Sequence, residues 1–387
     1  MNSVRIPLSS PDITEEEIKV VLRILRSGRL SLGPELQSFE EEMARYIGTK
    51  YAVAVSSGTA GLHCVVRALG LKDGDEVITS PFSFIASANC LLFERVKPVF
   101  VDIDPRTLCL DAEKIEKKIT PRTKAILAVH LVGIPCPMDR IQQIADKHKL
   151  VVIEDACEAI GAAWGEKKLG SIGNAGVFAF YPNKQMTTGE GGVITTNDAE
   201  LARICKSLRN QGRSQEDGYL FERLGYNYRL TDFQAAIGRV QLARMSEILE
   251  RRRQVAAWYF EELGNVRDIL LPPRTGDGRE SWFIFLIRLS ETYSSSDRNT
   301  LRQLLRQDGI ETGAYFSPIH LQPFYQSQFG YKEGDFPVTE HVAARTLALP
   351  FYNQLSSGEV SYVTGNLISY LKLLEKKSMS KTVYHES

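Results

Sequence analysis

The chain has 387 residues, long enough for about two domains because a single hydrophobic core stops growing near ~250 to 300 residues. Lysine plus arginine and aspartate plus glutamate each number 47, so no net basic field favours a nucleic acid partner. No apolar run reaches the roughly 18 residues of a membrane span, and the first residues lack a signal-peptide pattern. Six scattered cysteines without a C-x-x-C pair favour free thiols over disulfides or zinc. We therefore expect a cytoplasmic protein with no membrane partner, no nucleic acid partner and no metal site.

Alternating strand and helix patterns fill the first half of the chain. Short β-branched runs predict seven strands, over 51–57, 76–81, 97–104, 124–133, 151–157, 176–182 and 191–197. Helices are predicted before the first strand and between the earlier strands. They include 38–48, 59–70 and 137–149. This order predicts an α/β fold with a mostly parallel seven-stranded sheet. The last two runs are too close for a crossover, so we expect 191–197 to enter antiparallel.

The second half predicts a smaller unit. A long helix should begin at a capping box formed by Thr231 and Gln234. A strand over 281–289 and two helices should follow, the last capped by Ser356 with Glu359. We therefore expect a large cofactor-binding domain over 1–250, a small C-terminal α/β domain over 251–375 and a loose polar tail over 376–387.

One lysine, Lys184, lies in the stretch YPNKQMTTGEGG, between an aromatic turn and a glycine cluster. Taken alone, a lysine is usually solvated. Gly58 and Thr59 follow the first strand and open a helix, where backbone amides suit a phosphate, although a tight turn with a threonine cap is equally consistent. Glu154 and Asp155 end the fifth strand, where a carboxylate could partner a cationic ring nitrogen, cap a helix or form an ion pair.

These groups are expected at one edge of one sheet, because ligands of open α/β sheets gather at the carboxyl ends of strands. Pyridoxal phosphate requires a lysine, a phosphate seat and a carboxylate. Phe84, just past the second strand, could cover the cofactor ring, although an isolated phenylalanine is more often a core residue. Motifs for nucleotide-binding loops, zinc proteases and serine hydrolases are absent, and the histidines show no metal-ligand spacing.

Six stretches in this order and spacing resemble the DegT/DnrJ/StrS family of pyridoxal-phosphate sugar aminotransferases. They are SSGTAGLH, SPFSFIASAN, PVFVDIDP, VVIEDACEAIGA, FAFYPNKQMTTGEGG and GYNYRLTDFQAAIGRVQL. The resemblance covers roughly residues 5 to 375. It implies the aspartate-aminotransferase type of fold (fold type I) and a homodimer with active sites at the subunit interface. It also implies transfer of an amino group, usually from L-glutamate, to a keto sugar carried on a nucleotide.

The resemblance also implies roles for single residues. Lys184 corresponds to the Schiff-base lysine, Asp155 to the partner of the ring nitrogen and Phe84 to the residue stacked on the ring. Gly58 with Thr59 corresponds to the phosphate loop.

Further positions are implied to act on the phosphate and on the substrate. Asn227, in GYNYRL, resembles the asparagine that reaches the phosphate from the other subunit, and Arg229 is a candidate for substrate anions. Tyr315 and His320 lie where the family often contacts the sugar nucleotide.

Two positions depart from the family pattern. Ala179 replaces a frequent serine whose hydroxyl binds the cofactor phosphate, a contact that water or Asn183 could supply. Glu158 stands where many members carry glutamine or histidine beside the phenolic oxygen of the ring, so its carboxylate would either repel the phenolate or hold a proton.

The substrate expected from the resemblance is a 4-keto-6-deoxy hexose or a related 3-keto sugar on a nucleotide, for a surface polysaccharide or an amino sugar. Other readings stay open: amino-acid decarboxylation, sulfur transfer from cysteine, or a regulatory protein that kept the cofactor pocket without turnover. Cys157, two residues after Asp155, is expected to be buried and is a poor candidate for the thiol that sulfur transfer needs. The dehydratases of the family carry histidine in place of the lysine, so Lys184 argues against that branch.

Overall fold

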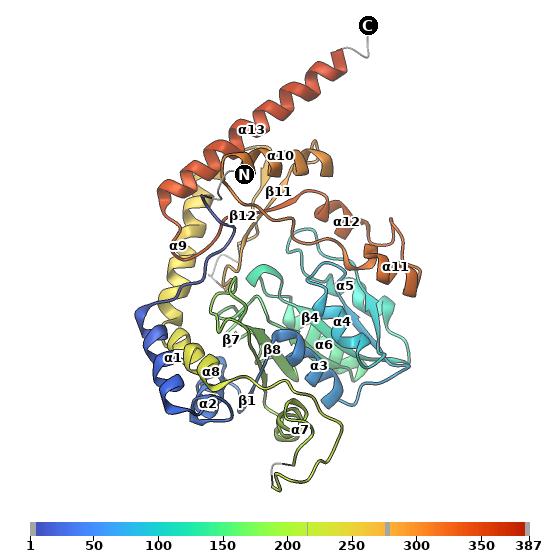
Figure 1. Cartoon of the computed structure of the whole chain (residues 1–387). Coiled ribbons are helices and arrows are strands. Elements are labelled where there is room, and N and C mark those ends of the chain that lie inside the picture. Colours follow the sequence, from blue (N-terminus) through green and yellow to red (C-terminus); the bar gives the residue numbers. More distant parts are fainter. Residues whose placement is uncertain (1–4, 215, 275–278, 384–387) are drawn as a thin grey trace.

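The computed structural model describes residues 5–214, 216–274 and 279–383. Its main element is a seven-stranded sheet with helices on both sides (Figure 1). Its strands are β1 (Tyr51–Val55), β2 (Glu76–Thr79), β3 (Lys97–Phe100), β4 (Thr123–Val129), β5 (Val151–Asp155), β8 (Ala175–Ala179) and β9 (Gly192–Thr196). All seven predicted strands are therefore confirmed, and each ends earlier than predicted. A separate hairpin joins β6 (Ala163–Trp164) to β7 (Lys167–Lys168).

The strand order is β1-β9-β8-β5-β4-β2-β3. Neighbouring strands run parallel from β8 to β3, whereas β9 pairs antiparallel with both β1 and β8. This confirms the antiparallel entry expected for 191–197. The short connection between β8 and β9 carries Lys184.

Helices cover both faces of this sheet because its strands are apolar on both sides. The helices of this part are α1 (Glu15–Ser27), α2 (Pro34–Ile47), α3 (Gly58–Ala68), α4 (Ala86–Leu92), α5 (Ala112–Ile115), α6 (Met138–His148), α7 (Ala199–Arg209), α8 (Asp232–Ala243) and α9 (Met245–Leu263). Val53 and Val55 of β1 belong to the core shared with α3 and α7, whereas Ala52 and Ala54 belong to the core shared with α2 and α6.

The predicted long helix after residue 231 is two helices. Its capping box is confirmed, since Thr231 accepts a hydrogen bond from the N–H of Gln234 and the side chain of Gln234 accepts one from the N–H of Thr231. The helix is interrupted at Arg244, whose backbone (φ −91°, ψ 5°) is not helical, so α8 and α9 are separate elements. The prediction of one continuous helix is therefore wrong at this residue.

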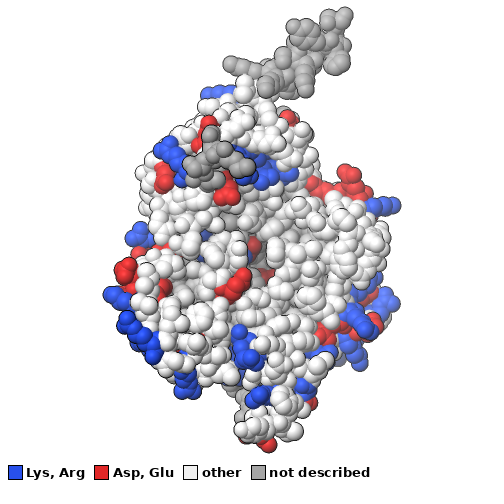
Figure 2. Space-filling view, in the orientation of Figure 1, with Lys and Arg blue, Asp and Glu red and all other residues white. Residues whose placement is uncertain are grey.

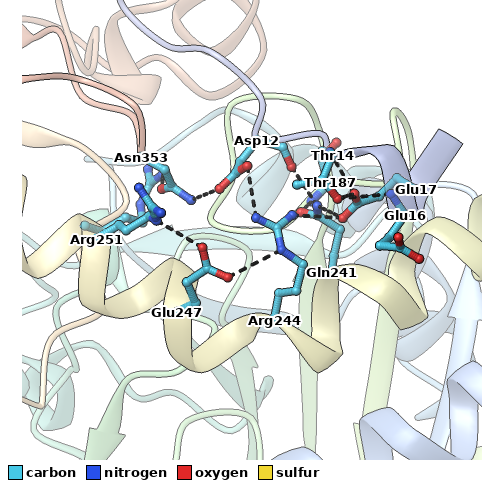
Figure 3. A network of polar contacts seen from close by, with 11 residues as sticks. Asp12, Thr14, Glu16, Glu17, Thr187, Gln241, Arg244, Glu247, Arg251 and Asn353 are labelled. Atoms are coloured by element: carbon cyan, nitrogen blue, oxygen red, sulfur yellow. Dashed lines mark hydrogen bonds and ion pairs between the residues drawn. The ribbon is translucent and has the colours of Figure 1, made fainter.

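Polar contacts around Arg244 join the N-terminal segment to this interruption (Figure 3). Its guanidinium lies 3.2 Å from Asp12 Oδ1 and 3.0 Å from Glu17 Oε1. Gln241 donates to Glu17 Oε1 at 2.7 Å, and its own side-chain oxygen accepts the N–H of Thr187 at 3.3 Å. Thr187 belongs to the β8–β9 connection, so the network reaches the turn that carries Lys184.

A three-stranded antiparallel sheet forms the second part, with strands β10 (Ile269–Leu270), β11 (Phe285–Leu289) and β12 (Thr346–Leu349). The predicted strand over 281–289 is confirmed only from Phe285 onward. Its helices are α10 (Ser295–Gln307), α11 (Pro323–Phe329), α12 (Pro337–Ala343) and α13 (Ser357–Val383). Two helices were predicted, and the short helices α11 and α12 were not.

The end of the chain also differs from the prediction. The cap of α13 is confirmed, because Ser356 Oγ donates to Glu359 Oε2 at 2.7 Å and accepts the N–H of Glu359 at 3.3 Å. The tail predicted to be loose over 376–387 is helical as far as Val383, and its last four residues lie outside the described residues. The proposed domain division at residue 250 falls inside α9 and stays a prediction.

Among the described residues, no helix combines the length and the apolar character that crossing a membrane requires. In the same part of the chain, no group of three or more His, Cys, Asp and Glu side chains is placed to hold a metal ion.

Candidate active site

A cavity of about 710 Å³ lies at the carboxyl ends of several strands of the large sheet. Figure 2 shows a hollow near the middle of the molecule, with Lys and Arg side chains gathered mainly toward the edges of that face. The predicted site residues that line the cavity are Gly58, Thr59, Phe84, Asp155, Glu158, Asn183, Lys184 and Tyr315. The edge expected from the strand order therefore holds most of the predicted site.

Lys184 is not a solvated surface lysine, since its side chain is only 13% exposed. The turn that carries it is closed by a hydrogen bond from the N–H of Lys184 to the carbonyl of Tyr181, at 2.9 Å. Its Nζ lies 3.5 Å from Glu158 Oε1 and 4.1 Å from the centre of the Phe283 ring. A carboxylate and an aromatic face both attract an ammonium group, so the amine is held inside the cavity.

Asp155, the last residue of β5, is oriented by two donors. Ser87 Oγ donates to Asp155 Oδ2 at 2.7 Å, and the N–H of Cys157 donates to Oδ1 at 3.2 Å. Ser83 Oγ lies 2.7 Å from Ser87 Oγ and extends the chain of hydroxyls. These bonds fix the direction of the carboxylate toward the cavity. The two serines were not predicted. Their four-residue spacing, in the turn that leads into α4, could have indicated that both hydroxyls lie on the same side of the chain.

Glu154 has a different role from its neighbour Asp155. Successive residues of a strand point to opposite faces, so the two carboxylates diverge. Glu154 is fully buried and accepts hydrogen bonds at 2.7 to 2.8 Å from three N–H groups of the turn over 170–173. Burial acts to raise the pKa of Glu154, but the contact with His130 and these amides outweigh it and the pKa is lowered. Glu154 is therefore structural, and of the two carboxylates that end β5 Asp155 is the one that lines the cavity.

The N-terminus of α3 opens into the cavity at Gly58. Ser57 caps the helix by accepting the N–H of Ala60 at 3.1 Å. A Cβ atom at Gly58 would lie 2.7 Å from Ala179 Cβ and 2.8 Å from Cys157 Sγ, so only glycine permits this close approach of helix and strand. The first amides of a helix have no acceptor within it and attract anions. This terminus therefore suits a phosphate.

Glu158 is buried behind Lys184. Its Oε2 accepts the N–H of Val132 at 2.9 Å, while Oε1 faces the lysine. Burial raises the pKa of Glu158, and the positive charge of Lys184 opposes that rise without cancelling it.

Three predicted residues do not line the cavity. Asn227 is exposed, and Arg229 donates to Asn210 Oδ1 at 3.0 Å on the surface segment after α7. His320, predicted to contact the substrate, is fully buried, and its Nε2 lies 2.9 Å from Glu340 Oε1. In this chain His320 therefore holds the 334–340 segment rather than facing the cavity.

Other lining residues were not predicted from the sequence. They include Ser57, Ser83, Ser87, Tyr181, Glu190, Phe283 and Phe316. Phe283 was expected within a strand, yet it precedes β11 and its ring faces Lys184.

The sequence profile of the DegT/DnrJ/EryC1/StrS aminotransferase family matches residues 11–368. The chain belongs to this family. It is 40% identical to the GDP-perosamine synthase of Caulobacter vibrioides over 365 residues, covering 94% of this chain and 97% of that protein. It is also 40% identical to the spore coat polysaccharide biosynthesis protein SpsC of Bacillus subtilis over 369 residues, covering 92% and 95%.

Solved structures of this family share the fold. The PLP form of the Streptococcus pneumoniae protein Spr1654, named as a sugar aminotransferase, matches with a TM-score of 0.90 and 29% identity over 94% of this chain and 98% of that one. The expected fold class is therefore confirmed, and the chain is an enzyme of a sugar aminotransferase family.

Proposed function

We propose that this enzyme uses pyridoxal phosphate to transfer an amino group from L-glutamate to a keto sugar carried on a nucleotide. The observation that carries the proposal is the buried amine of Lys184 in one cavity with the oriented carboxylate of Asp155 and the N-terminus of α3. The names of the two 40% identical relatives, which concern perosamine and spore coat polysaccharide, support a sugar substrate and a polysaccharide pathway.

The cavity fits the cofactor in three respects. Gly58 and Thr59, at the N-terminus of α3, line the cavity, and the backbone amides of a first helical turn suit the phosphate. Asn183 Oδ1 is buried in the lining and has no hydrogen-bond partner among the described residues, so a bound group would satisfy it. The ring of Phe84 is 59% exposed at the lining and could cover the cofactor ring. The family often has serine in place of Ala179, and we assign the missing phosphate contact to Asn183 or to water.

When bound, pyridoxal phosphate supplies an aldehyde that condenses with an amine and a ring that takes up the electrons of a carbanion. Lys184 Nζ is the atom that would hold the cofactor and that would carry a proton to or from the substrate. Asp155, oriented by Ser87 and by the N–H of Cys157, is the residue that would hold the ring nitrogen of the cofactor. Glu158 and Phe283 would keep the free amine inside the cavity between these steps.

We further propose a homodimer with shared active sites. Asn227 and Arg229 lie outside this chain's own cavity, on a surface segment, so their implied contacts with the phosphate and with substrate anions would be made in a second copy. Tyr315 lines the cavity and would contact the sugar nucleotide. The six free cysteines support a reducing, cytoplasmic location. The sugar proposed is a 4-keto-6-deoxy hexose or a related 3-keto sugar.

Sulfur transfer is disfavoured by the state of Cys157. Burial raises the pKa of the Cys157 thiol well above its usual value, and the nearby charge of Asp155 adds to the rise. The thiol therefore stays protonated and is a poor nucleophile.

The experiment is an absorbance spectrum of the protein with pyridoxal phosphate, before and after L-glutamate, followed by turnover with a panel of nucleotide-linked keto sugars. Conversion to the pyridoxamine form and then amination of a 4-keto or 3-keto sugar is the expected result. A cofactor band that glutamate leaves unchanged would contradict the donor. Conversion by glutamate without turnover of any sugar would contradict the substrate class and favour the regulatory alternative. Lys184→Ala should form no absorbance band of lysine-bound cofactor. Lys168→Ala, at a half-buried lysine outside the cavity, is its matched control and should form the band.

A further inference from the structure

Two tyrosines flank Asn227 and turn to the same side of the chain. The rings of Tyr226 and Tyr228 are stacked, with centroids 5.0 Å apart and an interplanar angle of 13°. Alternate residues of an extended segment point to opposite sides. Asn227 is exposed, and among the described residues its side chain makes no hydrogen bond. The segment is thus anchored through its tyrosines while the amide between them is left free.

The anchor is a buried pair, His63 on α3 and Glu94 after α4. His63 Nε2 lies 2.8 Å from Glu94 Oε1, and the two side chains are only 5% and 7% exposed. The hydroxyl of Tyr226 donates to Glu94 Oε1 at 2.9 Å, and the hydroxyl of Tyr228 lies 3.1 Å from His63 Nδ1. Each tyrosine hydroxyl therefore has its own partner in the pair.

The charge of Glu94 strengthens this anchor. Burial acts to raise the pKa of Glu94, but hydrogen bonds from His63, Arg67 and Tyr226 outweigh it and the pKa is lowered. Hydrogen bonds to an ionised carboxylate are shorter and stronger than neutral ones. Burying a charged carboxylate costs free energy unless several donors compensate for it. Such an arrangement under the 226–228 segment indicates that the position of this segment matters.

The backbone ties the same segment to the phosphate end of the cavity. The carbonyl of Tyr228 accepts the N–H of Ser56 at 2.8 Å, and the N–H of Tyr228 donates to the carbonyl of Arg209 at 2.9 Å. Ser56 is two residues before Gly58, where α3 begins. The backbone therefore joins the anchored segment directly to the residues that precede α3.

We propose that His63 and Glu94 are positioning residues, which hold Tyr226 and Tyr228 so that Asn227 is presented to the cofactor phosphate of a second copy of this chain. The inference rests on the proposed function, in which two subunits share each site. A donor supplied by another subunit binds well only if its direction is set beforehand, because freezing a mobile loop on binding reduces affinity.

The test is the double variant Tyr226→Phe/Tyr228→Phe, which removes both hydroxyls and keeps both rings. We expect its affinity for pyridoxal phosphate to fall about ten-fold, as in Asn227→Ala, because a hydrogen bond to a charged group is worth roughly this factor. The matched control is Tyr370→Phe, which removes a tyrosine hydroxyl that donates to the carboxylate of Asp308, far from the cavity, and should leave the affinity unchanged.

A hybrid dimer separates positioning from loss of structure. One subunit carries Lys184→Ala and the other carries the double variant, so a single site combines a native lysine with a native 226–229 segment from its neighbour. Half of the sites should then form the visible absorbance of lysine-bound cofactor with wild-type affinity. A subunit damaged in its own fold would not be rescued in this way.

If the double variant binds pyridoxal phosphate with wild-type affinity while Asn227→Ala binds it more weakly, the positioning role alone is overturned. A weakened double variant that the hybrid does not rescue would also overturn it. Wild-type affinity in Asn227→Ala would overturn the shared site and the positioning role together, whereas absence of cofactor binding in the wild type would overturn the proposed function itself.

Discussion

Lys184 Nζ and Glu158 Oε1 lie 3.5 Å apart in a cavity where both side chains are nearly inaccessible to solvent. The carboxyl group also accepts a backbone N–H from Val132, so its position is set by the chain and not by the lysine alone. A buried acid beside the reactive amine determines how that amine is held before the cofactor arrives.

The raised pKa of Glu158 predicts a pH dependence of stability. A carboxyl group with a folded-state pKa above its unfolded value binds more protons in the native state. Its contribution is therefore fully present below its ordinary pKa of 4.5 and is lost as the pH rises through the higher folded value. Glu158→Gln should remove this loss, so the cofactor-free variant should gain stability relative to the wild type as the pH rises.

Urea unfolding of both proteins across that pH range measures the difference. Glu261→Gln, at an exposed position of α9, is the control and should follow the wild type at every pH. A Glu158→Gln variant that loses stability relative to the wild type with rising pH would reverse the sign and contradict the assignment.

Ser87 should matter through Asp155. Ser87→Ala removes the 2.7 Å donor to the carboxylate, and we expect the half-reaction with glutamate to slow roughly ten-fold, since a hydrogen bond to a charged group is worth about 1.5–3 kcal/mol. Ser83→Ala removes only the hydrogen bond between the hydroxyls of Ser83 and Ser87, and should slow the reaction less. Stopped-flow absorbance measures both. Equal rates in Ser87→Ala and wild type would contradict the role of this bond.

Gly58 should not tolerate a side chain. In Gly58→Ala the new Cβ meets Ala179 and Cys157 at under 3 Å, so we expect a loss of about 1–3 kcal/mol of stability and weaker cofactor binding. The control is Gly365→Ala in α13, where nothing lies within 4 Å and a gain of about 0.4–1 kcal/mol is expected. Thermal unfolding compares the pair, and an undamaged Gly58→Ala would show that α3 can retreat from β8.

The contacts of Arg244 predict its importance for stability. Arg244→Met leaves the buried Glu17 without its cation, and removing one partner of such a pair costs about 3–5 kcal/mol. Arg251→Met removes an exposed i,i+4 pair with Glu247 in the same network and should cost less than about 0.5 kcal/mol (Figure 3). Chemical denaturation measures both changes, and similar losses would contradict the distinction.

Local patterns predicted the large sheet well because its strands are buried on both faces and read as continuous apolar runs. The antiparallel strand β9 followed from the shortness of its connection to β8. The break at Arg244 could not be predicted, since the sequence around it continues a helical pattern and the partners Asp12 and Glu17 are more than two hundred residues away. Tertiary contacts decided the backbone there.

The same division holds in the site. Lys184 and Asp155 stand out because they follow or end buried strands, where ligands gather. Phe283 and Glu94 carry no such signal, since an aromatic residue before a strand and a glutamate after a helix are ordinary. Their roles arise from packing between distant segments. His320 shows the converse, because a histidine in a recognisable motif is held by Glu340 in this chain.

The most direct test of the central claim is borohydride reduction of the protein loaded with pyridoxal phosphate, followed by digestion and mass spectrometry. Reduction fixes the cofactor to the lysine that bears it. We expect the phosphopyridoxyl group on the peptide that contains Lys184, and no label in Lys184→Ala. A label on another lysine in the wild type, or an equal label in Lys184→Ala, would contradict the assignment of Lys184 as the residue that holds the cofactor.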